Sequence, residues 1–142
     1  MLKPHQQMHA SLISLKAATP ETLPWTWDPR YNTVVQILKE ADATSIQPRI
    51  AEHLPTPWSN QTTPPLPPQI TSLIRNLSGL QDDQILYTGS PTSADLLFAA
   101  FWPWSDQLHV SLRVGVYSPH SGKKPFPSWL RPIASQIFNL SP

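Results

Sequence analysis

A period-two pattern of apolar and polar positions runs through residues 108–116. The apolar positions of this run are Leu108, Val110, Leu112, Val114 and Val116, and His109, Ser111, Arg113 and Gly115 fall between them. Because successive side chains of a strand point to opposite faces, the alternation predicts an antiparallel strand with one buried and one polar face. Residues 85–89 and 95–104 are predicted as two further strands. A helix over 94–102 that ends before Pro103 is the alternative for the longer run.

Apolar residues at spacings of three and four predict helices elsewhere in the chain. The predicted helical segments are 6–18, 31–45, 47–54, 69–79 and a tail that begins near Pro132. In the second segment Val34, Val35 and Leu38 form one apolar stripe, and Pro48 is expected in the first turn of the third. Gly79 stands where a helix C-cap favours positive φ. The helices and strands predict an α+β fold, in which three or four of these helices pack on a small antiparallel sheet.

Proline is unusually frequent, with 18 prolines among 142 residues. Residues 19–30 are therefore predicted as an extended connector, and residues 55–68 as a polyproline II linker or surface loop. A chain of this length buries one hydrophobic core rather than two. We expect a single domain over residues 1–142, with a flexible N-terminus and a proline-rich loop at 55–68.

Composition argues against several function classes. Only four glycines are present, so a phosphate-binding glycine loop is not expected. The net charge is +1 and Lys123-Lys124 is a small basic patch, so no nucleic-acid partner is expected. There is no cysteine, no apolar run long enough to span a membrane and no signal-peptide pattern, which favours a cytoplasmic protein. His5 and His9 have the spacing of one helix face but no third ligand nearby, so neither a metal nor another cofactor is expected.

A serine-hydrolase site is the enzymatic alternative. Its candidate groups are Ser90 and Ser93 as nucleophiles, His109 and His120 as bases, and Asp95 and Asp106 as orienting carboxylates. The loop that holds these serines lacks the Gly-x-Ser-x-Gly elbow, and local turn hydrogen bonds account for its composition. We therefore expect a protein that is not an enzyme.

Two tryptophans bracket a proline at residues 102–104. Pro103 has no N–H group for a sheet ladder, so it is expected at a strand end or on an edge, and Trp102 and Trp104 then share one face. That face is either packed under the helices or exposed as an aromatic patch. Tryptophan is enriched at protein interfaces, and the hairpin also presents polar side chains beside these rings. The expected interaction residues are Trp102, Trp104, His109, Arg113 and Trp58.

The run SADLLFAAFWPWSDQLHVSLRVGVYSPHSG, residues 93–122, resembles the C-terminal hairpin region of CupS-type proteins. These are small subunits of the cyanobacterial NAD(P)H dehydrogenase complex that serves inducible carbon dioxide uptake. The resemblance implies a fasciclin-like α+β fold and a peripheral, non-catalytic subunit at the cytoplasmic face of a thylakoid complex. One departure is that no apolar strand runs into the Phe-Ala-Pro-Thr signature of fasciclin domains.

Residues and resemblance together favour a non-catalytic accessory subunit or protein-interaction domain. Its expected partners are protein subunits of a larger, membrane-attached complex, and the chain itself is not expected to span the membrane. The alternative is a small-molecule or carbohydrate-binding domain that uses exposed tryptophans as a platform.

Overall fold

A six-stranded antiparallel sheet forms the centre of the molecule, with the strand order β1-β2-β6-β5-β4-β3. The computed structural model describes residues 4–91, 95–118 and 130–140. The strands are β1 (Trp25–Asp28), β2 (Thr33–Lys39), β3 (Thr56–Trp58), β4 (Ile85–Thr88), β5 (Leu96–Pro103) and β6 (His109–Tyr117). The helices are α1 (Pro4–Ala17), α2 (Glu40–His53), α3 (Pro68–Asn76) and α4 (Arg131–Ile137). The predicted α+β class is confirmed, whereas the fasciclin-like fold is not.

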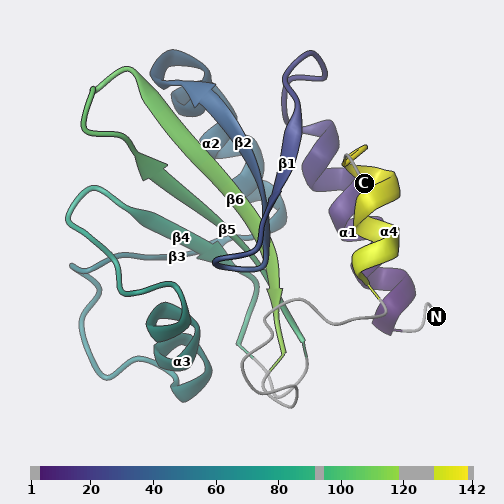
Figure 1. Cartoon of the computed structure of the whole chain (residues 1–142). Helices are drawn as coiled ribbons and strands as arrows, with labels where there is room; N and C mark the ends of the chain where they lie inside the picture. The colour runs from purple at the N-terminus through teal and green to yellow at the C-terminus, as the bar shows by residue number, and fades with distance from the viewer. Residues whose placement is uncertain (1–3, 92–94, 119–129, 141–142) are drawn as a thin grey trace.

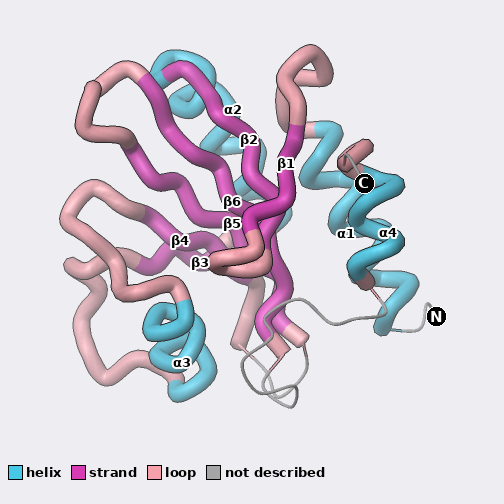
Figure 2. Tube along the Cα trace, in the orientation of Figure 1, coloured by secondary structure: helices cyan, strands magenta, loops and turns pink. Residues whose placement is uncertain are grey.

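The helices lie on both sides of the sheet. Helices α1 and α4 lie side by side and pack with α2 on one face, while α3 covers part of the opposite face (Figures 1 and 2). The larger apolar cluster includes Leu12 of α1, Ile46 of α2 and Phe138, whose ring centroid lies 4.7 Å from that of Trp25. The smaller cluster forms under Ile70 and Leu73 of α3. The sheet therefore has a three-helix side and an α3 side.

Strand β6 lies inside the sheet between β2 and β5 and follows the predicted alternation. Its apolar positions from Val110 to Val116 pack on the three-helix side. Its alternate residues face the α3 side, where Gly115 lies opposite Phe98 of β5. The predicted polar face of this strand is thus directed toward the side that α3 covers only in part.

The run before the hairpin is a strand and not the alternative helix. Pro103 ends β5 opposite Val110, which fits a residue that cannot donate to the ladder. The chain then turns through residues 104–108, where Gln107 has a φ of 61°. Strand β4 also occurs where a strand was expected. The three predicted C-terminal strands are therefore confirmed.

The predicted helix over 31–45 is wrong. Residues 33–39 form β2, which pairs with both β1 and β6. Val34 and Leu38 point to the three-helix side, and Val35 is buried on the other side. A strand buried on both faces has no polar alternation, and its apolar spacing therefore also fits a helix.

The short helix predicted over 47–54 is the second half of a longer one. Helix α2 begins at Glu40, directly after β2, so Pro48 lies inside it rather than in its first turn. Proline removes the backbone hydrogen bond to the carbonyl four residues earlier. Pro48 and Thr44 are both exposed, so water can reach the carbonyl that the proline leaves free.

The proline-rich segment 55–68 contains a strand as well as a loop. Within it, β3 pairs with β4 at the edge of the sheet, so the linker prediction is wrong for these residues. Helix α3 follows as predicted, and Gly79 at its end has a φ of 88° and donates its N–H to the carbonyl of Ile74. Helices α1 and α4 confirm the first and last predicted helices, and β1 lies within the predicted extended segment 19–30.

Candidate functional site

The α3 side of the sheet carries exposed residues where β2 ends and the β5–β6 hairpin turns. Strand pairing places Ile37 opposite Ser111 and Lys39 opposite His109, so all four share one face. Trp104 lies next to these four residues because its indole contacts the side chain of Ser111. The side chains of Ile37 and Trp104 are 41% and 42% exposed. We call these five residues, Ile37, Lys39, Trp104, His109 and Ser111, the hairpin patch.

Trp104 is held in place although its ring is half-exposed. Its indole Nε1 donates a hydrogen bond of 2.8 Å to Oγ of the buried Ser111. Its backbone N–H donates to the carbonyl of His109 at 2.8 Å, and the two rings have centroids 5.0 Å apart. A large ring that is fixed before contact loses little conformational entropy on binding.

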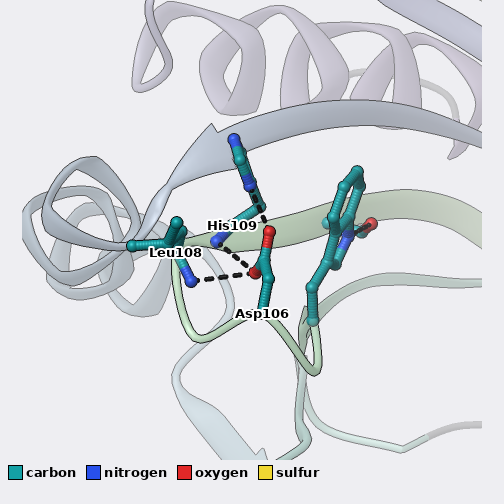
Figure 3. A network of polar contacts seen from close by, with 5 residues as sticks. Asp106, Leu108 and His109 are labelled. Carbon is teal, nitrogen blue, oxygen red and sulfur yellow. Dashed lines mark hydrogen bonds and ion pairs between the residues drawn. The ribbon is translucent and has the colours of Figure 1, made fainter.

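The turn between β5 and β6, next to the hairpin patch, is held in place by Asp106 (Figure 3). Its Oδ1 accepts hydrogen bonds from the backbone N–H groups of Leu108 at 2.8 Å and His109 at 3.1 Å. Its Oδ2 lies 2.7 Å from Nδ1 of His109. The hydrogen bond to the His109 side chain, followed by that to the Leu108 amide, holds the pKa of Asp106 below its ordinary value. The carboxylate thereby fixes both the turn and the His109 ring.

Arg113 lies beside the hairpin patch in a cluster of aromatic rings. Its side chain is 14% exposed, and its Nη1 donates a hydrogen bond of 2.6 Å to Asp28 Oδ2. The guanidinium carbon is 4.4 Å from the Trp102 ring centroid and 5.2 Å from that of Tyr31. These two rings meet edge to face at 5.2 Å. Arg113 therefore has an ion pair and two cation–π contacts, which together fix Trp102 beside the patch.

Two nitrogen atoms in this cluster are buried without a hydrogen-bond partner. They are Nε1 of Trp102 and Nε of Arg113. Trp102 lies opposite Ser111, in the same row of the sheet as Ile37. A buried N–H group without an acceptor costs free energy, so these two nitrogens lower the stability of the cluster rather than offer donors to a partner.

Four of the five expected interaction residues, Trp102, Trp104, His109 and Arg113, gather on the α3 side of the sheet. Trp58 lies elsewhere. It is 8% exposed, packs in the cluster under α3 and donates from Nε1 to Thr88 Oγ1 at 2.9 Å. We therefore assign Trp58 to the core and not to an interaction surface.

Sequence reasoning missed Ile37, Lys39, Tyr31 and Asp28, all of which lie on β1, β2 or the turn between them. Tyr31, Ile37 and Lys39 lie within the segment 31–45 predicted as a helix, and Asp28 lies in the predicted extended segment before it. The sequence signal that would have found the residues on β2 is the short, mostly apolar run at 33–39, which is typical of an internal strand that is buried on both faces.

The groups considered for a hydrolase come together only in part. Asp106 does orient His109, but Ser90 and Asp95 lie near the start of β5, whereas His109 lies next to its end. Ser93 and His120 lie outside the described residues. Three shallow cavities of about 210, 220 and 420 Å³ lie near α1, α2 and the loop before β1, and neither Trp102 nor Trp104 lines any of them. The two tryptophans thus form a surface and not the wall of one of these pockets.

Two further properties concern only the residues that the structure describes. Among them, no group of three or more His, Asp or Glu side chains is placed to hold a metal ion, and the His5 side chain is not included. None of the helices in these residues is long and apolar enough to cross a membrane. Comparison of the chain with protein-family models, curated proteins and solved structures found no match.

Proposed function

We propose that this protein is a non-catalytic accessory subunit that docks onto a larger assembly through the hairpin patch. The observation that carries the proposal is a pair of half-exposed apolar side chains that both lie next to Ser111, Ile37 on β2 and Trp104 directly after β5. Fixed tryptophans next to aliphatic side chains are typical centres of binding energy at interfaces. The polar residues Lys39 and His109 lie beside them and suit the rim of such an interface.

The resemblance of residues 93–122 to CupS-type proteins suggests which assembly to test first. We propose subunits of the membrane-attached NAD(P)H dehydrogenase complex of cyanobacteria that serves carbon dioxide uptake, with this chain attached peripherally on the cytoplasmic side of the thylakoid membrane. The hairpin patch lies within or directly opposite the segment that carries the resemblance.

The proposal is tested by tagging the protein and purifying it from gently solubilised membranes of its own source. Trp104→Ala and Ile37→Ala are compared with Ile13→Ala, which removes a 50% exposed aliphatic side chain from α1, a helix on the other side of the sheet. We expect the unsubstituted protein and Ile13→Ala to retain the same stoichiometric partner. The two patch variants should lose it while their circular dichroism spectra stay unchanged.

Two results would contradict the docking function. One is recovery of the unsubstituted protein as a free monomer. The other is a partner that both patch variants retain in full. A hot-spot tryptophan is expected to contribute about 2 kcal/mol or more, so Trp104→Ala should weaken association by at least about 30-fold.

A further inference from the structure

Two carboxylates near the hairpin patch, those of Asp28 and Asp106, are already engaged. Asp28 accepts from Arg113 and from the backbone N–H of Arg30, and Asp106 accepts from His109 and two turn amides. The carboxylate oxygens of both side chains therefore accept hydrogen bonds from within the domain.

Two basic side chains on the same side of the sheet are not neutralised in this way. Lys39 and Arg30 are exposed, and within residues 4–91, 95–118 and 130–140 no carboxylate forms a salt bridge with either. The Arg30 guanidinium instead lies 5.0 Å from the Tyr31 ring, which packs edge to face on Trp102. Within these residues both side chains are therefore free to meet a negative charge on a partner.

We infer that the partner surface bound by the hairpin patch is an acidic segment of a protein, with glutamate or aspartate side chains next to apolar ones. The inference rests on the proposed docking function. Apolar side chains of the segment cover Ile37 and Trp104, and its carboxylates neutralise Lys39 and Arg30. Charges of this kind at the rim of an interface set specificity and association rate.

A nucleic acid fits this surface less well, although aromatic and basic side chains also occur in nucleic-acid sites. The net charge of the whole chain is only +1. An acidic peptide can place its carboxylates beside Lys39 and Arg30 and keep apolar groups elsewhere, whereas a phosphate backbone carries charge along its whole length.

The inference is tested by ¹⁵N-edited NMR of the full chain, because the indole N–H groups of Trp102 and Trp104 and the Nε–H of Arg113 give separate signals. The probe is a short peptide in which glutamate alternates with leucine. The matched control peptide has glutamine at every glutamate position, and oligothymidylate is titrated separately. We expect saturable shifts of the two indole signals with the glutamate peptide, weakened by salt, and binding of the glutamine peptide weaker by at least about fivefold.

Charge-reversal variants provide a second test of the acidic partner. The double variant Lys39→Glu with Arg30→Glu should bind the glutamate peptide about tenfold more weakly. Arg49→Glu, on an exposed position of α2, makes the same type of change on the three-helix side and should bind normally. Equal binding of both peptides, absence of saturable shifts, or tighter binding of oligothymidylate would overturn the inference.

The two proposals fail in different ways. If capture of the natural partner depends on Trp104 but is unaffected by the double charge reversal and by salt, the docking function stands and the acidic partner is wrong. If capture is insensitive to Trp104 as well, the docking function is wrong.

Discussion

Gly115 leaves room for the ring of Phe98, and an alanine at this position would fill that room. The two residues lie opposite each other on β6 and β5. A Cβ atom built on Gly115 would lie 2.7 Å from Cζ of Phe98 and 3.0 Å from Cγ2 of Thr33. Favourable carbon–carbon contacts are about 3.5–4.0 Å, so the Phe98 ring would have to move by roughly 1 Å. Phe98 is fully buried and has no solvent-filled space to move into.

The expected cost follows from two opposing effects. Overpacking a well-packed core costs about 1–3 kcal/mol. Replacing glycine within a strand by alanine returns about 0.5–1 kcal/mol through lower entropy of the unfolded chain. Gly115→Ala should therefore lower the free energy of unfolding by about 1–2 kcal/mol.

The assay is urea denaturation followed by tryptophan fluorescence, with an unchanged m value as the sign of an unchanged unfolding reaction. In a Phe98→Leu background the smaller side chain can make room, so the same substitution should cost less than about 0.5 kcal/mol. Gly89→Ala is the matched control, because a Cβ atom added there would meet no atom within 4 Å. A neutral Gly115→Ala, or an equal cost in both backgrounds, would refute this account of the packing.

Three further predictions concern the hairpin and the end of α3. Trp102→Ala should lower the free energy of unfolding by about 2–3 kcal/mol in urea denaturation, because its ring packs on Arg113 and Tyr31. The Trp104 ring is half-exposed, so Trp104→Ala should lower it by less than about 1.5 kcal/mol. Equal losses in the two variants would contradict the different burial of the two rings. The lowered pKa of Asp106 means that its contribution to stability is present above its unfolded pKa of about 3.9 and is lost as pH falls through the folded value. The stability difference between the unsubstituted protein and Asp106→Asn should therefore shrink in denaturation curves below about pH 4, and a difference independent of pH would contradict this. Gly79→Ala should destabilise by about 1 kcal/mol because φ is 88° there, and a melting temperature equal to that of the unsubstituted protein would speak against that strain.

The hairpin was predictable from sequence because its signals are local. Polar residues on one face of β6 make its period visible, and Pro103 marks the end of β5. The same period places Trp102 and Trp104 on one face of their strand and His109 and Arg113 on one face of the next, while the pairing register puts these on the same side of the sheet. Trp104 and His109 of the hairpin patch could therefore be inferred from the order of residues, whereas Ile37 and Lys39 of β2 could not.

The rest depends on contacts between distant parts of the chain. Val34, Val35 and Leu38 belong to a strand because β6 pairs with it, and nothing within the segment itself distinguishes that strand from an apolar helix. Ile37 was missed for this reason. The proline-rich surroundings of Trp58 suggest a linker and hence a surface position, while its indole is in fact held by Thr88 of β4.

The position of β6 inside the sheet has a consequence for how the chain is made. Among the described residues it is the last strand in sequence, yet β2 and β5 are linked within the sheet through it. As the chain leaves the ribosome, β1–β2 and β3–β4–β5 each end in an unpaired edge until β6 has been synthesised. We therefore expect nascent chains that end before residue 109 to depend on chaperones and to be sensitive to protease. Chains that include β6 should gain protection across both halves of the sheet at once.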